Sequence, residues 1–351
     1  MSNQSETIEI SDPSALSAKP LVSVYMLAYR HEKFIADAID SVIAQNCNFP
    51  IELIIGEDCS PDCTGEIVRD YQRRYPHFIR VLTSGQNVGA HANAARCRAA
   101  CRGDYVAICE GDDYWCDPSK LTRQVDLLSM RPTCSLIYHS ARIIDAISGS
   151  EIGLIGLPFG SCRLTVEDMI LGDGGLFPTA SVLVKRSVLM KSAEWARNAP
   201  VGDYPLGIKA ALEGDVIYLD RVMSVYRANV PHSWTQRHHT TLAHRLTYAN
   251  AIEDMLVQLQ NYLGKPSWRP VQATISKYYS DIVVRIEGAG VERKSIYQQT
   301  KSKMHGSDRL LACLAAKFGV RLPGIKSAIR KSKTLMRVIN TRLHRRENTG
   351  T

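Results

Sequence analysis

The 351-residue sequence predicts an α/β protein whose mostly parallel β-sheet is flanked by helices. Short apolar runs rich in β-branched residues alternate with amphipathic segments between residues 21 and 139. The first run, 21–28, is apolar at almost every position, as in a strand buried on both faces. Strands separated by helices need right-handed crossovers, which make neighbouring strands parallel.

The expected elements follow one another in a regular order. Strands are predicted at 21–28, 51–56, 79–83, 105–109 and 136–139, and helices at 34–43, 64–75, 90–100 and from Asp117 through Leu128. Apolar residues at spacings of three and four mark the first helix. Asp117 and Pro118 suit an N-cap followed by a first-turn proline. Later segments predict a loop that enters a strand within 177–186, a helix after Val201, a strand at 222–227, and helices at 242–263 and 271–286.

The charge is concentrated at the C-terminal end. Residues 301–351 hold 13 Lys and Arg against two acids, a net of +11, and subtracting this from the total of +8 leaves −3 for residues 1–300. Nucleic-acid binding depends on basic surface that contacts phosphates, so the main body is not expected to bind nucleic acid. The basic, amphipathic tail at 323–351 is expected to lie on an anionic membrane surface, with a solvated tail as the alternative.

No run of about 18 apolar residues is available to span a bilayer. The first 19 residues are polar and rich in serine, and they predict a flexible leader rather than a signal peptide. The expected location is therefore the cytoplasm, with peripheral attachment to the inner face of the cell membrane. Nine of the ten cysteines precede residue 163, without a C-x2-C pair, and are interpreted as reduced, buried or partly buried thiols rather than zinc ligands.

Polar residues that follow the predicted strands indicate the chemistry. The first strand leads into Tyr29-Arg30-His31-Glu32, which lacks the glycines of a dinucleotide-binding loop or a P-loop. The fourth leads into Glu110-Gly111-Asp112-Asp113. Three acids within four residues repel one another unless a cation neutralises them, and carboxylate oxygens suit Mn2+ or Mg2+. A solvated acidic turn is the alternative interpretation.

An ordered series of motifs gives these strand ends a family resemblance. The series comprises Val22-Ser23-Val24 leading to Tyr29, then Glu32, Ala38-Ile39-Asp40-Ser41-Val42, Gln45, Gly56 to Asp62, Asn87-Val88-Gly89, Gly103-Asp104-Tyr105 and Glu110 to Trp115. Each motif alone is weak, but their order and spacing over residues 20–130 resemble family 2 glycosyltransferases. The resemblance implies the GT-A fold, a Rossmann-like sheet, and an inverting transfer from a nucleotide diphosphate sugar.

The resemblance implies roles for residues that bind the donor. Tyr29 and Glu32 match positions near the base and ribose, and Asp58 matches an acid that contacts the base. Structural alternatives remain open: Tyr29 as a cap on the sheet, Glu32 as a first-turn acid of a helix, and Asp58 as an Asx-turn residue.

The resemblance also implies a metal site. Glu110-Gly111-Asp112 matches the family's D-x-D motif, in which the last acid binds the cation and the first leans toward the ribose. Asp112 and Asp113 are the expected metal ligands. Glu110 replaces the usual Asp and keeps its charge on a longer arm. His232 either contacts the diphosphate or metal or is a surface histidine of a loop.

Acceptor binding is expected from the second half of the chain. Asp203 heads a predicted helix and matches the family's catalytic base, which takes the proton of the acceptor hydroxyl; an N-cap role is the alternative. Asp215 and Asp220 are weaker candidates. Thr179 and Trp234 match positions that face the acceptor, and Trp234 also suits a packing role.

The expected organisation is a leader at 1–19, a GT-A domain at 20–238 with a nucleotide-sugar half (20–130) and an acceptor half (131–238), a helical extension at 239–322 and a basic tail at 323–351. The expected function is transfer of a sugar to a glycan hydroxyl, on an acceptor that a lipid carries, in cell-surface polysaccharide or lipopolysaccharide assembly. A non-catalytic sugar-nucleotide-binding or membrane-docking protein and a nucleotidyltransferase are the alternatives.

Overall fold

The structure is a computed structural model, and it describes residues 6–16, 19–158, 160–231, 233, 241–285, 290–306, 308–309 and 312. The chain divides into two compact units. The first unit holds the described residues up to 165 together with 174–192 and 202–236, and the second holds 166–173, 193–201 and those from 237 onward. No helix within the described residues is long and apolar enough to cross a membrane.

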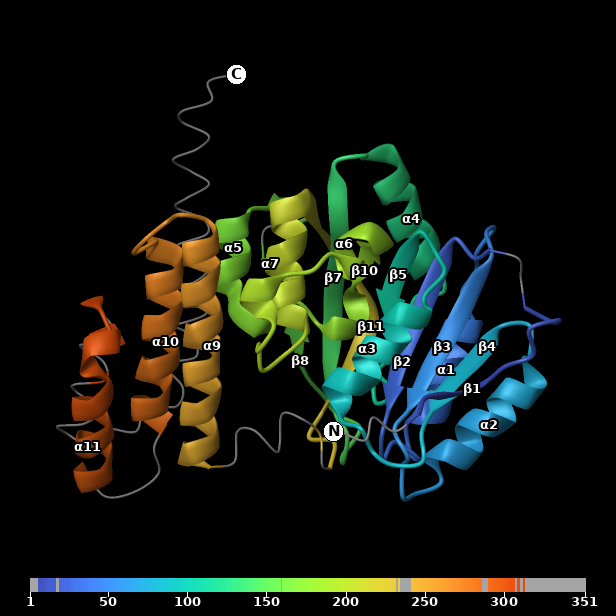
Figure 1. Cartoon of the computed structure of the whole chain (residues 1–351), viewed down its shortest axis with the longest axis horizontal. Helices are drawn as coiled ribbons and strands as arrows, with labels where there is room; N and C mark the ends of the chain where they lie inside the picture. The colour runs from blue at the N-terminus through green and yellow to red at the C-terminus, as the bar shows by residue number, and fades with distance from the viewer. Residues whose placement is uncertain are drawn as a thin grey trace. The chain divides into compact units, whose positions relative to one another are not determined.

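The first unit contains a mixed sheet and its flanking helices (Figure 1). Its strands are β1 (Ile8–Ile10), β2 (Val22–Ala28), β3 (Ile51–Glu57), β4 (Ile79–Thr83), β5 (Tyr105–Ile108), β6 (Tyr114–Trp115), β7 (Cys134–Asp145), β8 (Glu151–Ile155), β9 (Cys162–Leu164), β10 (Leu183–Lys185) and β11 (Asp215–Ala228). Its helices are α1 (Ile35–Ile43), α2 (Thr64–Arg74), α3 (Ala90–Ala100), α4 (Lys120–Met130), α6 (Arg186–Met190) and α7 (Asp203–Glu213), with a 3-10 turn η2 (Thr179–Ser181).

The strand order is β1-β4-β3-β2-β5-β10-β7-β11-β6. Strands β4, β3, β2 and β5 are parallel, which confirms the predicted parallel core. The short strand β10 enters between β5 and β7 and is antiparallel to both. The predicted fifth strand at 136–139 is the central part of the longer β7, which runs parallel to β11. The mixed α/β class is therefore confirmed. Strand β10 also confirms the strand expected within 177–186, although its antiparallel orientation was not predicted.

Two predicted boundaries are wrong. The leader contains β1, which pairs antiparallel with β4 and is tied to it by an ion pair between Glu9 and Arg80 at 2.9 Å. Helix α4 begins at Lys120, not at Asp117. The Asp117 carboxylate accepts hydrogen bonds from the amide and hydroxyl of Ser119, so it forms a turn before the helix.

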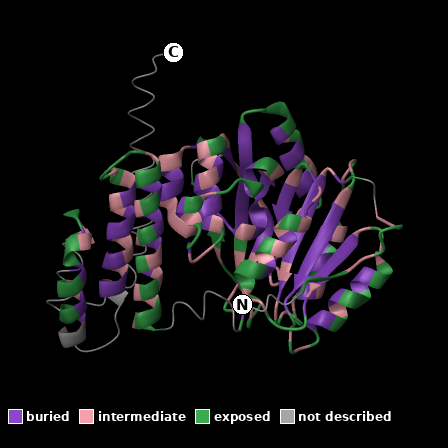
Figure 2. Ribbon diagram, viewed as in Figure 1, coloured by how far each residue is buried: buried purple, intermediate pink, exposed green. Residues whose placement is uncertain are grey.

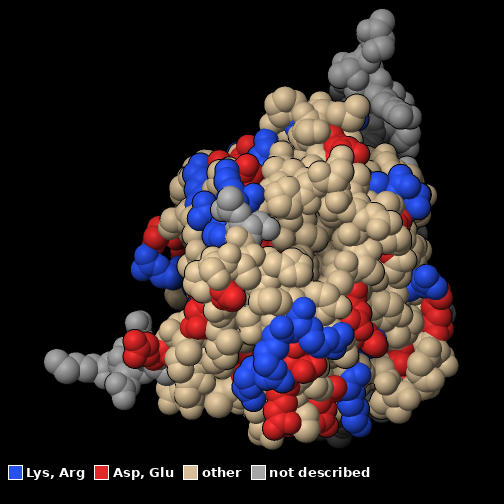
Figure 3. All heavy atoms as spheres, turned by 90° about the vertical axis from the view of Figure 1, so that its right-hand side faces the viewer, with Lys and Arg blue, Asp and Glu red and all other residues tan. Residues whose placement is uncertain are grey.

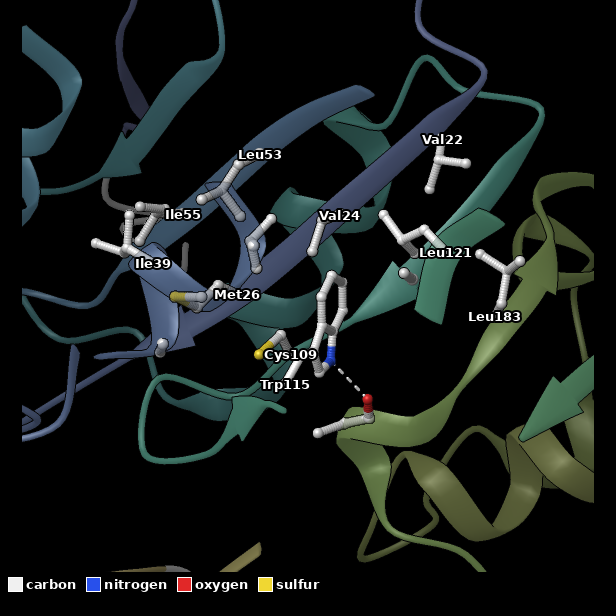
Figure 4. Close-up of a cluster of buried hydrophobic side chains, with 14 of the residues drawn as sticks. Val22, Val24, Met26, Ile39, Leu53, Ile55, Cys109, Trp115, Leu121 and Leu183 are labelled. Atoms are coloured by element: carbon white, nitrogen blue, oxygen red, sulfur yellow. Dashed lines mark hydrogen bonds between the residues drawn. The ribbon is translucent and has the colours of Figure 1, made fainter. Parts of the chain in front are cut away.

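Helices pack on both faces of the parallel strands. Apolar residues of β2 and β3 form the main core with α1, α2 and α4, and the strands are almost wholly buried (Figure 2). Figure 4 shows this cluster around Trp115, whose indole N–H donates to the carbonyl of Ala180 at 2.8 Å. On the opposite face α3 comes close to Gly56, where a Cβ atom would lie 2.3 Å from Asn93 Oδ1. Only glycine allows this approach.

Lys120 is an unusual member of the core because it is fully buried. Its ammonium donates to Gln124 Oε1 at 2.9 Å and lies 4.0 Å from the centroid of the Trp115 ring. Burial lowers the pKa of Lys120 to about 7. The charged form is therefore disfavoured in the folded protein relative to the unfolded chain.

This burial predicts a pH-dependent stability difference between the wild type and Lys120→Met. Between pH 7 and about 10 the unfolded chain binds a proton at Lys120 that the folded protein lacks, so the free energy of unfolding rises with pH. Relative to Lys120→Met, the wild type should gain about 1 kcal/mol per pH unit over this window. Urea unfolding at pH 7, 8 and 9 measures the slope. Lys33→Met at an exposed site is the control, and equal slopes in both variants would contradict the assignment.

The face that carries α2 has mixed charge (Figure 3). Lys and Arg side chains stand beside Asp and Glu side chains there, and Asp70 pairs with both Arg73 and Arg74 at 3.1 and 3.6 Å. This mixture agrees with the nearly neutral charge of residues 1–300.

The prediction that the cysteines are buried or partly buried thiols is confirmed for some of them. Cys97, Cys101, Cys109 and Cys134 are buried. Cys59 and Cys63 are exposed, contrary to the prediction, because they lie in the polar segment between β3 and α2.

The second unit is helical where it is described. It contains α5 (Val166–Gly172), the 3-10 turn η3 (Glu194–Ala196), α9 (Leu242–Tyr262), α10 (Arg269–Arg285), α11 (Gly290–Thr300) and the 3-10 turn η4 (Lys301–Lys303). The stripe predicted on α9 is buried, and its members are Ala249, Ile252, Met255, Leu256 and Leu259. Helix α10 packs on α9 and on α5, where Thr274 donates to the Ile170 carbonyl at 2.9 Å. Residues 166–173 and 193–201 thus belong to this unit and not to the predicted acceptor half, and the tail at 323–351 lies outside the described residues.

Candidate active site

The loop Tyr29–Glu32 after β2 is fixed to the loop after β3. The His31 amide donates to Thr64 Oγ1 at 2.8 Å, and Glu32 Oε2 accepts the Cys63 amide at 3.1 Å. These bonds join the carboxyl ends of two neighbouring parallel strands, where ligands of α/β sheets bind. Glu32 precedes α1, which begins at Ile35, so it is not the first-turn acid offered as its alternative. Its carboxylate instead accepts the amide of Cys63, the N-cap of α2.

Asp58 is buried and uses both carboxylate oxygens internally. They accept the backbone amides of Val88 and Gly89, each at 2.9 Å. The carboxylate thus holds the turn that leads into α3. Because these amides lie 30 and 31 residues away along the chain, the bonds are not those of the local Asx turn offered as the alternative. The Tyr29 ring is half-buried in the adjacent loop, and the Arg30 guanidinium lies 5.4 Å from its centroid.

The acidic segment after β5 is anchored by its own backbone. The Gly111 amide donates to the carbonyl of Leu27 at 3.0 Å, and the Asp113 amide donates to the carbonyl of Glu110 at 3.1 Å. The Asp112 side chain is 20% exposed, whereas Asp113 is almost fully buried. The two neighbouring aspartates therefore differ in their access to a ligand.

Arg227, at the end of β11, binds the acidic segment through several hydrogen bonds. The sequence did not predict this role. Its amide donates to Asp113 Oδ1 at 2.9 Å, and its guanidinium donates to the Asp112 carbonyl at 3.0 Å and to Asp37 Oδ2 at 2.5 Å. The guanidinium also lies 4.5 Å from the centroid of the Tyr114 ring. A basic residue at the end of the last core strand was the only signal in the sequence.

Burial and neighbouring negative charges raise the pKa values of acids in this segment. Burial, with added repulsion from Asp112 and Asp203, raises the pKa of Glu110 to about 8. Burial and the charge of Asp112 raise the pKa of Asp113 well above its usual range. Such like-charge clustering in a partly buried place is typical of functional sites. A cation bound nearby would favour the ionised carboxylates.

Asp203 is the first residue of α7 and lies near the acidic segment, because its charge acts on Glu110. The N-cap of α7 is Gly202, so the N-cap interpretation of Asp203 is wrong. The Thr179 hydroxyl donates to Asp203 Oδ2 at 3.4 Å. The structure thus brings Thr179 from η2 and Asp203 from α7 to the same place as Glu110.

The other candidate residues fall elsewhere. Asp215 begins β11, where it pairs with Arg163 at 2.9 Å. Asp220 accepts a hydrogen bond from the Tyr218 hydroxyl at 3.1 Å. His232 and Trp234 lie outside the described residues.

The carboxylate oxygens of this segment suit a hard divalent cation whose remaining coordination positions are filled by a bound ligand. Within the described ranges, no three His, Cys, Asp or Glu side chains are arranged to hold a metal by themselves. Mg2+ and similar ions are commonly held by one or two carboxylates together with substrate phosphates. Asp112 has the exposure for such a role, whereas one oxygen of Asp113 is occupied by the Arg227 amide.

Gly111→Ala is expected to disrupt the segment. A Cβ at this position would lie 2.8 Å from the backbone carbonyl of Leu27 and 2.7 Å from His31 Nδ1. Overpacking of this kind costs about 1–3 kcal/mol, so the melting temperature should fall. Gly85→Ala, where the added methyl meets nothing within 4 Å, is the control for differential scanning calorimetry. Equal melting temperatures for the two variants would contradict this expectation and show that the segment can shift to accept the added methyl group without cost.

The comparisons with known proteins agree with this geometry. The model of glycosyl transferase family 2 matches residues 23–145. An uncharacterised protein of Mycobacterium tuberculosis is 34% identical over 215 residues, which cover 61% of this chain and 60% of that protein. TuaG of Bacillus subtilis, named for teichuronic acid biosynthesis, is 32% identical over 120 residues, covering 34% of this chain and 46% of TuaG. The chain spans about 60% of the length of the mycobacterial relative.

Two solved structures share the fold. TarS of Staphylococcus aureus, solved with UDP-GlcNAc, aligns at a TM-score of 0.58 with 14% identity, covering 84% of this chain and 86% of that chain. The mannosyltransferase PcManGT of Pyrobaculum calidifontis, solved with GDP-Man and Mn2+, aligns at 0.53 with 14% identity, covering 91% and 86%. The family match and the GT-A-like sheet lead to one conclusion: residues 23–145 carry a glycosyl transferase family 2 domain, within a sheet of the GT-A fold.

Proposed function

We propose that the chain transfers a sugar, with inversion at the anomeric carbon, from a nucleotide diphosphate sugar to an acceptor hydroxyl in a Mn2+- or Mg2+-dependent reaction. The observation that carries the proposal is the acidic segment after the parallel strand β5, where the charges of Asp112 and Asp203 act on Glu110. Family membership and the nucleotide sugars bound to TarS and PcManGT support it.

In this proposal, Asp112 is a ligand of the cation, and Glu110 contacts the ribose of the donor. A bound cation would stabilise the negative charge of the departing diphosphate. Asp113 takes the role of positioning this segment, through its bond to the Arg227 amide, instead of the metal-ligand role expected from the family motif. Tyr29 and Glu32 line the adjacent loop toward the nucleotide. Asp58 acts through the turn that it holds at Val88 and Gly89.

Asp203 is assigned as the general base. A base must lie within reach of the acceptor hydroxyl and on the side opposite the departing group for inversion to result. The Thr179 hydroxyl, 3.4 Å from Asp203 Oδ2, orients this carboxylate and faces the acceptor.

The proposed acceptor is a glycan hydroxyl in cell-surface polysaccharide assembly. The similarity to TuaG supports this setting. A lipid-linked acceptor and docking of the tail at 323–351 on an anionic membrane complete the proposal, although both rest on residues outside those that the structure describes.

Thermal stabilisation by nucleotide sugars tests the proposal. A ligand that binds only the folded protein raises the melting temperature by mass action. A panel containing UDP-GlcNAc, GDP-Man and other nucleotide sugars, each with and without Mn2+, should give at least one cation-dependent rise. The same panel with Asp112→Asn should give none. No rise for any nucleotide sugar in the wild type would overturn the proposal.

A further inference from the structure

We infer that His31 supplies an imidazole ligand to the cation held by Asp112, and that it thereby favours Mn2+ over Mg2+. The inference rests on the proposed function, since it concerns the same cation. It concerns a residue of the loop after β2, whereas the acids come from the segment after β5.

The two candidate ligand atoms already face each other. His31 Nε2 lies 3.8 Å from Asp112 Oδ2, which is too far for a hydrogen bond. Ligand bonds of about 2.1 Å in an octahedral site separate neighbouring ligand atoms by about 3 Å and opposite ones by about 4.2 Å. The observed separation of 3.8 Å lies between these two values, and a movement of less than about 1 Å brings the two atoms to either of them.

The fold gives the His31 ring little freedom to turn elsewhere. Its amide is held by Thr64 Oγ1, and its carbonyl accepts the amides of Phe34 and Ile35 in the turn that begins α1. Arg30 directly before it has a φ of 60°, a left-handed conformation that reverses the chain at this point. The backbone therefore directs the ring toward the acidic segment.

The surroundings of the ring point in the same direction. Its Nδ1 is buried and has no hydrogen-bond partner among the described residues, and it faces Gly111. The side chain is 16% exposed, and because Nδ1 is buried, this exposure lies elsewhere on the side chain. Nε2, which faces Asp112, is therefore the nitrogen that can reach a cation, and Nδ1 would carry the ring proton.

The choice of ion follows from ligand chemistry. Carboxylate and phosphate oxygens suit Mg2+ and Mn2+ alike, whereas imidazole is a better partner for transition-metal ions. A site of one carboxylate, one imidazole and donor phosphates should therefore prefer Mn2+. Without the imidazole the preference should shrink, because Mg2+ gains little from nitrogen.

Pulsed electron paramagnetic resonance of bound Mn2+ tests the inference directly. The probe is Mn2+ with the nucleoside diphosphate that stabilises the protein most in the thermal panel. The wild type should show nitrogen modulation from an imidazole, which changes when the protein is grown with 15N-histidine. His31→Gln should lose this modulation and bind Mn2+ about tenfold more weakly or worse, with a smaller change for Mg2+.

The controls separate this inference from the function on which it rests. His77→Gln, at an exposed site, should keep the modulation. Modulation that persists in His31→Gln, or its absence from wild-type protein that binds Mn2+, overturns the role of His31 alone. The spectrum of the wild-type protein needs no variant, so it tests the inference even if His31→Gln unfolds. A wild type that binds no Mn2+ with any nucleoside diphosphate overturns the proposed function and this inference together.

Discussion

Replacing Asp203 by asparagine is expected to slow sugar transfer by a factor of about 10² to 10⁴ while folding and donor binding are retained. Asparagine keeps the shape of the side chain and can still accept the Tyr204 amide, which Asp203 Oδ1 accepts at 2.7 Å. It cannot take the proton of the acceptor hydroxyl. The rate loss should therefore appear in turnover and not in the melting temperature or the donor affinity.

Asp220→Asn is the matched control for this variant. Asp220 is also an aspartate of the first unit, but it contacts Tyr218 on β11 and has no assigned role in transfer. Its turnover should stay close to that of the wild type. Near-normal turnover by folded Asp203→Asn would remove Asp203 from the mechanism and leave the base to be sought elsewhere.

Replacing Asp112 by asparagine is expected to abolish cation-dependent donor binding. Metal clamps on a diphosphate contribute several kcal/mol, which corresponds to a loss of about two orders of magnitude or more in affinity. The Asp112 side chain is partly exposed, and its backbone carbonyl would still accept the Arg227 guanidinium, so the segment should remain folded. Isothermal titration with Mn2+ and a nucleoside diphosphate measures the loss.

Asp70→Asn provides the surface control for the titration. Within the part of the chain that the structure describes, Asp70 pairs with the exposed Arg73 and Arg74 of α2, and surface pairs of this kind contribute little to stability. Its Mn2+ and nucleotide affinities should match those of the wild type. Unchanged affinity in Asp112→Asn would refute the assignment of the cation to this side chain.

The parallel half of the fold could be predicted because its signals are local. The apolar runs at β2 and β3 and the three-and-four spacing in α1 are each visible within a dozen residues. The strand expected within 177–186 is present as β10. Its antiparallel orientation could not be predicted, since it depends on pairing with β5 and β7. Strand β1 was hidden for the same reason, because its pairing with β4 joins residues far apart in the sequence.

In the candidate site, too, local motifs could be predicted from the sequence and long-range contacts could not. The acids at Glu110, Asp112 and Asp203 could be named from motifs, and the structure brings their charges together. The role of Arg227 could not be named, because it depends on long-range contacts with Asp113 and Asp37. A motif reports which residue types are present but not which of their oxygens are already occupied.

Sugar transfer itself is tested most directly by 31P nuclear magnetic resonance of a nucleotide sugar incubated with the protein and Mn2+. A glycosyltransferase cleaves the bond between the sugar and the diphosphate, so a nucleoside diphosphate should appear in the wild type, slowly with water as acceptor. Asp203→Asn and Asp112→Asn should release far less. Formation of a nucleoside monophosphate with a sugar phosphate, or tight binding without any release, would contradict the account.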